Sequence, residues 1–467
     1  EYYDSQEGAP DKLLSTRVCT VDSIEGDFSS LAIPEEKLEG LDPLFKLTIA
    51  AGHEAFEDAQ MQDIDRARVG VNVANIVLPT DAMADMSYRI LAEKVTGFDL
   101  RAEGFPDPLN RYSAGLPAGA LAKALGLGAS TMTLDAACAS SLYALKLACE
   151  ELAAGRVDAM LAGGVCRPSC LYTAMGFSAL RAFSRSGYSR PFDASCDGLV
   201  VGEGAGIFVL KRLSDALRDG DRIYSLIKGI GLSNDRGGSL LAPDSEGQLR
   251  AMRQAYVEAA WRPSMVDLIE CHGTATPVGD AVEFDSMRTL WGKDGWAPAQ
   301  CVIGSVKSNM GHLLTAAGAA GLMKVLLAMK EETLPPTANF SQANPKMDYE
   351  GSPFKVLSQS SPWKRRKRSI PRRAALSAFG FGGINAHVLL EEWMPTDSPE
   401  QQKVAVGLDF QRSAGFSTVR PRRIDVAVVG LGAHVGSVKN LREFQEKCLS
   451  GESAFADRPR VRGAGAR

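Results

Sequence analysis

One block of the sequence constrains the fold more than any other, because two β-prone segments enclose a turn and a helix. Residues 131–134 are β-prone, Asp135 to Cys138 form the turn, residues 139–154 have strong helical periodicity, and residues 157–165 form a predicted buried strand. Consecutive strand–helix–strand units are typical of a buried, largely parallel sheet covered by helices. The block therefore predicts an α/β protein.

A similar order recurs later in the chain. A predicted strand over 266–270 leads into Cys271-His272-Gly273-Thr274, and a predicted strand over 301–305 leads into a loop that ends at His312. Two halves with related order indicate an ancient duplication. The other predicted elements are helices over 41–60, 281–290 and 316–329, and strands over 69–76, 374–378 and 387–392.

Composition excludes several classes of protein. Lys and Arg number 52 and Asp and Glu number 56, a net charge of −4, which argues against a protein built to bind nucleic acid or an anionic membrane. The longest apolar run, residues 316–329, contains Lys324 and is too short for a membrane span. The N-terminus has no signal-peptide pattern, and the 9 cysteines form no CxxC pair, so we expect a reduced, cytoplasmic protein without a disulfide framework.

Three residues at predicted strand ends are candidates for catalysis. Cys138 lies where a strand turns into a helix, a position whose unpaired amides and dipole favour a thiolate and can stabilise an oxyanion. His272 and His312 follow strands in the small-residue loops HGTATPVGD and KSNMGH. Each alone is more often a structural residue, but a cysteine and two histidines at three strand ends indicate a catalytic group. The histidines show no metal-ligand spacing, so no metal is predicted.

Five motifs resemble the β-ketoacyl synthase family of fatty acid and polyketide synthesis, in the family's order and spacing over residues 41–393. They are DAACASSL around Cys138, RPFDASCDGLVVGEGAG (190–206), CHGTATPVGDAVE (271–283), GSVKSNMGHLLTAAGAAG (304–321) and SAFGFGGINAH (377–387). The resemblance implies a thiolase-like fold with five α/β/α/β/α layers built from two related halves. It also implies a homodimer, or a pseudodimer with a chain-length-factor domain.

The resemblance implies a role for each catalytic candidate. Cys138 would be the nucleophile that takes an acyl chain from an acyl carrier protein, and His272 and His312 would assist decarboxylation of a malonyl extender. Lys307 would support the site electrostatically, with Glu283 in the buried network behind it.

A substrate site is implied in the same way. Phe381 would gate the two substrate channels, and its backbone amide would join that of Cys138 in the oxyanion hole. No bound cofactor is implied beyond the phosphopantetheine arm of the carrier protein. The residues implied to bind the acyl chain or that arm are Phe177, Thr274, Thr276, Asn309 and Gly382.

The segments LDPLFKL, FDLRAEGFPDPLNRYSAGLPAGALAKALGL and LYTAMGFSALRAFSRSG look most like ketosynthases of polyunsaturated fatty acid synthases. The implied reaction is decarboxylative Claisen condensation of a Cys138-bound acyl chain with malonyl-acyl carrier protein, which gives 3-ketoacyl-acyl carrier protein. The alternatives are an iterative polyketide ketosynthase, a catalytically silent ketosynthase-like partner, another thiolase-fold enzyme and a Cys–His hydrolase. A degradative thiolase would carry a second cysteine where this chain has GFGGINAH.

Residues 1–393 form the predicted ketosynthase domain, and residues 394–423, with Pro, Gln and Ser, form a predicted linker. Residues 424–467 open with IDVAVVG and resemble the start of a chain-length-factor domain that is truncated here. No strand of this type precedes Glu1, so we expect the first strand of the ketosynthase domain to be missing. In a less favoured alternative, residues 424–430 fill that vacant position.

Two further features have competing interpretations. The basic cluster from Lys364 to Arg373 (KRRKRSIPRR) is either a solvated loop or a surface that docks an acidic carrier protein. The run Gly202, Gly204 and Gly206 leads into IFVLKRL, a predicted strand, and therefore indicates close packing rather than a dinucleotide site.

Overall fold

The computed structural model describes residues 15–395, apart from residues 16, 25, 62, 97–106, 169, 238–241 and 294. The chain divides into two compact units at residue 410, and all described residues belong to the first. The predicted linker over 394–423, except its first two residues, and the predicted second domain over 424–467 lie outside the described residues.

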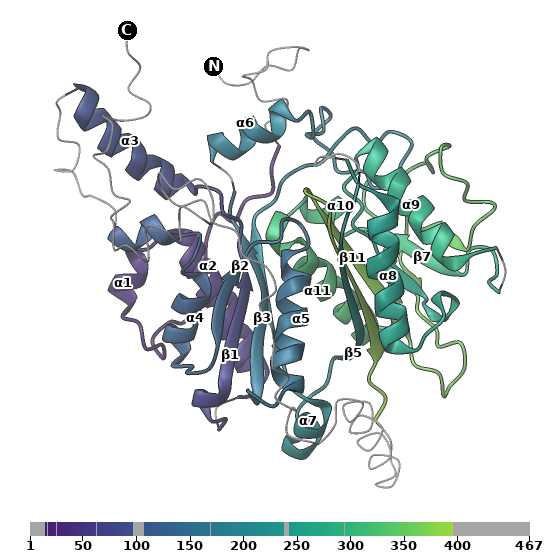
Figure 1. The fold of residues 1–467 in the computed structure, drawn as a ribbon, viewed down its shortest axis with the longest axis horizontal. Coiled ribbons are helices and arrows are strands. Elements are labelled where there is room, and N and C mark those ends of the chain that lie inside the picture. The colour runs from purple at the N-terminus through teal and green to yellow at the C-terminus, as the bar shows by residue number, and fades with distance from the viewer. Residues whose placement is uncertain are drawn as a thin grey trace, which may run out of the picture. The chain divides into compact units, whose positions relative to one another are not determined.

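The first sheet has four strands in the order β2 (Thr131–Leu134), β1 (Val69–Ala74), β3 (Ala159–Cys166) and β4 (Gly204–Leu210). β1 runs parallel to β2 and β3, which lie on either side of it (Figure 1). β4 runs antiparallel to β3. β1 and β3 are buried along their whole length, as expected for the centre of a parallel sheet with helices on both faces.

The second sheet has six strands in the order β5-β12-β11-β6-β7-β9. β6 runs parallel to β7 and β11, whereas β12 runs antiparallel to both β11 and β5. A separate pair, β8 (Thr333–Leu334) and β10 (Ser361–Pro362), is antiparallel. The strands of the second sheet are β5 (Ser225–Asn234), β6 (Leu268–Glu270), β7 (Cys301–Gly304), β9 (Phe354–Val356), β11 (Arg373–Gly380) and β12 (Ile384–Glu392).

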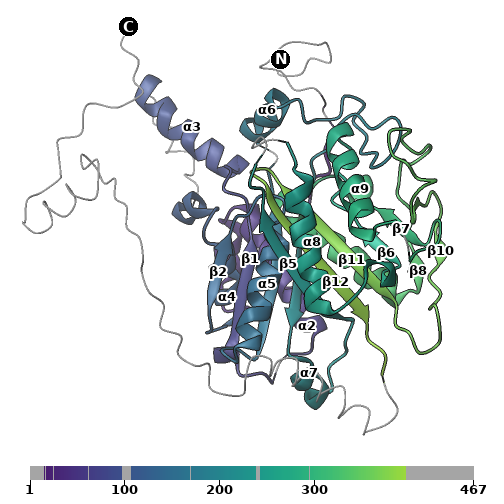
Figure 2. The same ribbon diagram turned by 45° about the vertical axis from the view of Figure 1, so that its right-hand side comes forward.

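Two helices, α5 (Ser140–Ala153) and α11 (Ala317–Lys330), lie between the sheets and share one core with both of them (Figure 1). α2 (Pro43–Asp58) and α4 (Pro117–Leu125) cover the outer face of the first sheet. α8 (Ser245–Ala259) and α9 (Pro277–Trp291) cover the outer face of the second (Figure 2). The predicted five-layered α/β/α/β/α fold is confirmed. The remaining helices are α1 (Glu35–Glu39), α3 (Asp81–Thr96), α6 (Leu171–Ala179), α7 (Leu213–Asp219) and α10 (Lys307–Met310).

Small residues let the central helix layer pack tightly. A Cβ atom on Gly318 of α11 would lie 2.9 Å from Leu142 Cδ2 of α5, and one on Gly206 of β4 would lie 3.1 Å from Ala319 Cβ. Larger side chains would push α11 away from α5 and from the first sheet. The glycine run around Gly206 is therefore a packing feature within a strand, as predicted.

The two sheets repeat one topology. The order β2-β1-β3-β4 in the first matches β7-β6-β11-β12 in the second, with the same parallel and antiparallel pairs. α5 connects β2 to β3 just as α11 follows β7 on the way to β11. The predicted duplication is visible in this shared order.

The basic cluster is partly paired and partly exposed, because four of its arginines bond carboxylates whereas Lys364, Lys367 and Arg368 are exposed, as a solvated loop predicts. Arg365 and Arg372 both bond Glu392, at the end of β12. Arg366 bonds Asp267, and Arg373 bonds Glu391. These contacts fasten residues 364–373 to the end of the second sheet.

No described helix is long and apolar enough to cross a membrane. The eight cysteines in the described part of the chain are all free thiols, and most of them are buried.

Candidate active site

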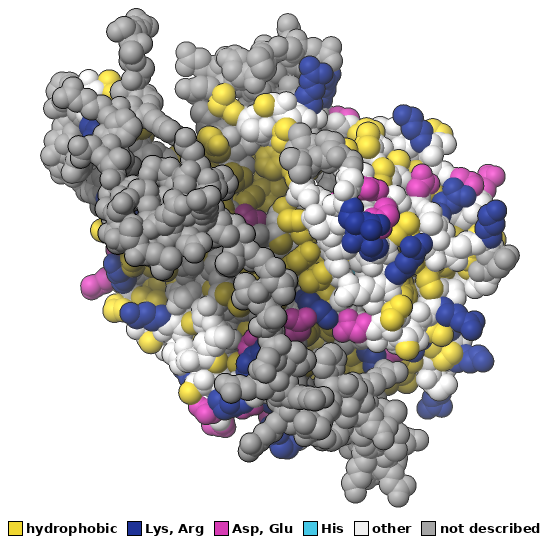
Figure 3. Space-filling model, viewed as in Figure 1, with side chains coloured by type: hydrophobic (Ala, Val, Ile, Leu, Met, Phe, Trp, Pro, Cys, Tyr) yellow, Lys and Arg dark blue, Asp and Glu magenta, His cyan; other side chains and the backbone are white. Residues whose placement is uncertain are grey.

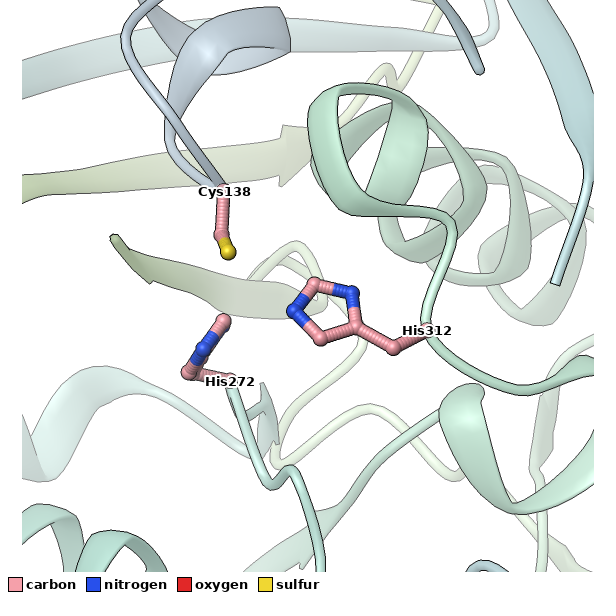
Figure 4. A group of neighbouring side chains, drawn as sticks. All are labelled: Cys138, His272 and His312. Carbon is pink, nitrogen blue, oxygen red and sulfur yellow. The ribbon is translucent and has the colours of Figure 1, made fainter. Parts of the chain in front are cut away.

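Three strand ends converge on one point. Cys138 follows β2, His272 follows β6 and His312 follows β7 and α10. One possible ligand atom from each residue lies within 4.8 Å of those of the other two, and the three side chains face one another (Figure 4). The sheets thus bring together residues that are far apart in the sequence, between positions 138 and 312.

The turn that holds Cys138 has an unusual backbone. Ala137 has φ of +50°, a left-handed conformation that is uncommon for a residue with a side chain. Ser140 stabilises the turn, because its Oγ accepts a hydrogen bond from Ala136 N at 2.7 Å and donates one to Ala137 O at 2.5 Å. Gly380 of β11 packs against it, since a Cβ atom there would lie 2.9 Å from Cys138 N.

The electrostatic surroundings of Cys138 differ from the sequence-based expectation of a thiolate. Burial raises the pKa of the Cys138 thiol to about 11, although Lys307 and the backbone amides of Phe381 and Cys138 act in the opposite direction. The expectation is wrong because it considered the helix end alone and not the loss of solvent around the sulfur. Without substrate, the thiol is therefore the dominant form at neutral pH.

His312 has a defined tautomer. Its Nδ1 accepts a hydrogen bond from Leu314 N at 3.1 Å, so the proton of the neutral ring is on Nε2, which faces Cys138 and His272 (Figure 4). Burial, with the nearby Lys307 charge, holds the pKa of His312 well below its usual value. His312 is therefore a neutral hydrogen-bond donor.

His272 has a freer ring. Its Nδ1 is buried without a hydrogen-bond partner among the described residues, and its ring lies edge-on to that of His312, with centroids 5.3 Å apart. Burial, Lys307 and His312 lower the pKa of His272 well below its usual value. The neutral ring always has one nitrogen lone pair, and here that lone pair can accept a proton.

These tautomers also decide whether the group suits a metal ion. A histidine binds a metal through an unprotonated nitrogen. In His312 that nitrogen already accepts the Leu314 N–H, and the nitrogen facing the group carries a proton. The arrangement therefore fits hydrogen-bond donation to an oxygen better than metal binding.

A buried charged network lies behind the histidines. Glu283, on α9, accepts hydrogen bonds from His272 N at 2.7 Å and Gly273 N at 2.8 Å, and so holds the His272 loop. Lys307 is 4% exposed at the start of α10, and burial lowers the pKa of its ammonium group. Burial raises the pKa of Glu283, which Lys307 and the amides only partly offset.

Sequence analysis missed two members of this network. Asp280 is fully buried and accepts hydrogen bonds from Phe192 N at 2.8 Å and Ala275 N at 3.1 Å; burial raises its pKa to about 7. Glu270, the last residue of β6, accepts from Val306 N at 2.6 Å. The sequence signals were an acidic residue immediately before a predicted helix and one at the end of an apolar predicted strand.

The residues implied to bind substrate lie in several places. Thr274 and Thr276 are half-buried before α9, and their hydroxyl oxygens are 2.9 Å apart. Asn309 is exposed on α10, where its Oδ1 accepts from Ser308 Oγ at 3.2 Å. Gly382, with φ of +86°, lies in the loop between β11 and β12.

Phe381 and Phe177 lie close together. The Phe381 side chain is 40% exposed, and its ring centroid lies 6.3 Å from that of Phe177 on α6. Phe177 also contacts Phe183, at 5.8 Å, within an apolar cluster that includes Leu199 and Leu313. The aromatic pair thus joins the loop beside Cys138 to an apolar region. On the side of the molecule drawn in Figure 3, hydrophobic side chains gather in a hollow near the centre of the view.

Comparison with known families covers most of the chain. Residues 1–216 match the β-ketoacyl synthase N-terminal domain, and residues 224–341 match the β-ketoacyl synthase C-terminal domain. Residues 344–422 match the ketoacyl-synthetase C-terminal extension.

Curated relatives are much longer proteins. One subunit of the polyunsaturated fatty acid synthase of Thraustochytrium sp. is 38% identical over 349 residues, which are 74% of this chain and 16% of that protein. A mycocerosic acid synthase-like polyketide synthase of Mycolicibacterium smegmatis is 34% identical over 424 residues, 90% of this chain and 19% of that protein. The chain thus spans less than a fifth of each.

Solved structures agree with these matches. A PfaC keto synthase-chain length factor is 33% identical with a TM-score of 0.82, and the match covers 98% of this chain and 48% of that one. The ketosynthase from module 6 of the bacillaene synthase from Bacillus subtilis 168 is 32% identical with a TM-score of 0.69, over 80% of this chain and 64% of that one.

Proposed function

The chain belongs to the β-ketoacyl synthase family of condensing transferases, and from that premise we propose that it catalyses decarboxylative Claisen condensation with malonyl-acyl carrier protein. The product is a 3-ketoacyl-acyl carrier protein, so the activity is that of a 3-oxoacyl-acyl carrier protein synthase. The observation that carries the proposal is the convergence of Cys138, His272 and His312 within 4.8 Å.

The first step transfers an acyl chain to Cys138. The sulfur attacks the carbonyl of an acyl thioester, and the carbon–sulfur bond to the carrier's pantetheine breaks. The Cys138 proton moves to His272, whose accepting nitrogen is unengaged, and then to the departing pantetheine thiolate. His312 cannot take this proton, because its lone pair accepts the Leu314 N–H.

The second step removes carbon dioxide from the malonyl group. The electron pair of the breaking carbon–carbon bond forms an enolate, whose oxygen accepts a hydrogen bond from His312 Nε2–H. The low pKa of both rings matters here, since a neutral His312 stabilises the enolate as a donor and a neutral His272 beside it does not protonate its carbon.

In the third step the enolate carbon attacks the acyl carbonyl on Cys138. The new oxyanion lies against the backbone amides of Cys138 and Phe381, which already face the sulfur. Collapse of this intermediate breaks the bond to Cys138 and releases the 3-ketoacyl product on the carrier. The Lys307 charge favours the departing thiolate.

The carrier protein supplies the only prosthetic group that this reaction requires, its phosphopantetheine arm. The paired hydroxyls of Thr274 and Thr276 are suited to hydrogen-bond the amides of that arm. Phe381 separates the entrance of the arm from the apolar cluster around Phe177, where the acyl chain binds.

We assign the condensation to polyunsaturated fatty acid synthesis. The support is the similarity to part of a polyunsaturated fatty acid synthase and to a keto synthase-chain length factor. A second candidate, an iterative polyketide ketosynthase, is favoured by the similarity to several polyketide synthases. A silent partner is disfavoured, because the nucleophile and both histidines are in place.

A ketosynthase-like partner, either a second copy or a chain-length-factor domain, fits the edge of the first sheet. β2 is the edge strand, it is only partly buried, and Met132 on it is 38% exposed. Exposed strand edges with apolar side chains are natural pairing surfaces.

Intact-mass measurement tests the function. The chain is incubated with carrier protein loaded with saturated, unsaturated and 3-hydroxy acyl chains, and then with malonyl-carrier protein. We expect acylation that is lost in Cys138→Ala and kept in Cys149→Ala, a control thiol on α5 outside the site. Malonyl should then convert the acyl enzyme into 3-ketoacyl product.

The acyl panel separates the two candidates. A preference for long, unsaturated chains supports the polyunsaturated assignment, and a preference for 3-hydroxy chains supports the polyketide one. Acylation that persists in Cys138→Ala, or folded protein that no chain acylates, would remove the condensing function.

A further inference from the structure

Glu270 is a buried carboxylate that touches three parts of the site framework. It is 1% exposed, ends β6 and lies two residues before His272. Its Oε1 accepts the hydrogen bond from Val306 N, next to Lys307, and its Oε2 lies 2.7 Å from Lys324 Nζ. It therefore joins β6, the start of α10 and α11.

The chain makes room for the Glu270–Lys324 ion pair. A Cβ atom on Gly321 of α11 would lie 3.0 Å from Glu270 Cγ, and one on Gly304 of β7 would lie 3.8 Å from Lys324 Nζ. Lys324 is also the charged residue that interrupts the apolar sequence of α11, and its side chain is 12% exposed. A buried charge in this position requires its partner.

Glu270 is also an electrostatic partner of Lys307. Among the charges around Lys307, Glu270 contributes most to raising its pKa, ahead of Glu283, Cys138 and Asp280. Lys307 in turn is the charge that most favours the Cys138 thiolate. Two lysines thus compete for one carboxylate, and one of those lysines acts on the nucleophile.

We propose that Glu270 and Lys324 form a positioning pair that leaves the positive charge of Lys307 available to Cys138. With Lys324 present, the charge of Glu270 is neutralised locally. Without Lys324, Glu270 would neutralise Lys307 instead, and the thiolate would lose its support. The inference extends the proposed condensation, because it assigns a role to two residues that do not touch the substrate.

The test measures alkylation of Cys138 by iodoacetamide against pH, with the modified peptide quantified by mass spectrometry. Apart from Glu270 in the double variant, the ionisable groups that face Cys138 or Lys307 stay unchanged in every variant. They are Asp135, Cys166, His272, Asp280, Glu283 and His312. For Lys324→Met we expect a profile about one pH unit higher, so that alkylation at pH 8 is about tenfold slower.

Two further variants separate this role from packing. Lys324→Arg keeps the charge and should retain the wild-type profile. The double variant Lys324→Met/Glu270→Gln removes the pair together and should return the profile close to wild type. A packing defect would instead persist or worsen in the double variant, and it would expose the buried Cys301 to the reagent as well.

An unshifted profile in Lys324→Met, or a double variant as slow as the single one, would overturn the proposal. If Lys324→Met does not fold, Lys324→Gln replaces it. If neither folds, the alkylation profile of the double variant must match that of the wild type, and slower alkylation in the double variant would refute the proposal. Alkylation requires no carrier protein. Failure here is therefore distinguishable from failure of condensation, which the acylation experiment detects.

Discussion

The two halves of the described body share a topology but contribute differently to the site. The loop after β2 supplies Cys138, and the equivalent loop after β7 supplies His312. The loop after β6 supplies His272, whereas in the equivalent loop after β1 the Asn75 side chain donates to Ser113 O at 2.8 Å and to Ala114 O at 3.3 Å. The two halves therefore have equivalent strand ends, but only some of these strand ends carry a candidate catalytic residue.

The halves also differ in buried charge. The first half provides a sulfur and the Cys138 backbone amide from a strained turn. The second provides both imidazoles and the charged groups behind them, Lys307, Glu270 and Glu283. We infer that the first half holds the acyl group, the second half decarboxylates malonyl, and the two tasks are separable by substitution.

The edges of the sheets differ too. In the second sheet β12 is covered by β5, whose Ile230 and Leu232 amides donate to Glu258 and Gln254 of α8. The equivalent edge of β4 has no partner strand among the described residues.

The largest effect expected is on the nucleophile. Cys138→Ala should lower condensation by about 10⁴-fold or more, about 5.4 kcal/mol, because no other described thiol faces the histidines. Decarboxylation of malonyl-carrier protein, measured by carbon dioxide release, should persist, because the second half is intact. Parallel loss of both activities would mean that the halves do not act separately.

The reciprocal change is His312→Ala. Removing the Nε2–H donor should slow decarboxylation by about 10²- to 10³-fold, as for other oxyanion donors. Acylation of Cys138, followed by intact mass, should continue. His53→Ala on α2, remote in sequence from the site, serves as the control, and equal loss of acylation and decarboxylation in His312→Ala would contradict the division.

In each half, an arginine–carboxylate ion pair, here called the arginine clasp, joins the residue just before one strand (β3 or β11) to the end of the next strand (β4 or β12). The arginine is on the β4 side in the first half and on the β11 side in the second. Asp158 and Arg212 form it in the first half at 2.6 Å, and Arg372 and Glu392 form it in the second. Arg372 is 3% exposed, so Arg372→Met should cost about 3 kcal/mol, more than Arg212→Met at about 1–2 kcal/mol.

Denaturant unfolding compares these variants. Arg368→Met, an exposed arginine of the same basic cluster, should change stability by less than about 0.5 kcal/mol. Equal losses in Arg212→Met and Arg372→Met would show that burial does not distinguish the clasps.

The smallest effect expected is that of Lys307, in the second half, on the ionisation of Cys138, in the first half. Because the pKa of Cys138 is about 11, alkylation should rise about tenfold per pH unit between pH 7 and 9, with no inflection from the histidines, whose pKa values lie well below 6.5. Lys307→Met removes a charge that lowers this pKa and should slow alkylation about tenfold at each pH. Lys46→Met, on α2, is the matched control. An alkylation rate that no longer rises above pH 7 would contradict the raised pKa of Cys138.

Sequence analysis located the site because its residues follow recognisable elements. Periodicity and apolar runs predicted the strands that end before Cys138, His272 and His312, and the helices α5 and α11. The region that contains β5 and α8 received no prediction, although both elements complete the second sheet and its outer layer. Their pattern is weaker, because β5 is only partly buried and includes Gly229 and Gly231, against which α8 packs.

The sequence alone determined the α/β class, the strand ends that present Cys138, His272 and His312, and the small residues that allow close packing, because these depend on local periodicity and residue type. Only the tertiary structure decided the ionisation of that group and the partners of its charges. Burial of Cys138 requires both sheets, and the contact of Glu270 with Lys324 joins β6 to α11, whereas the Leu314 amide that bonds His312 comes from only two residues along the chain. Solvent exclusion and charge pairing arise only when the two sheets enclose the site.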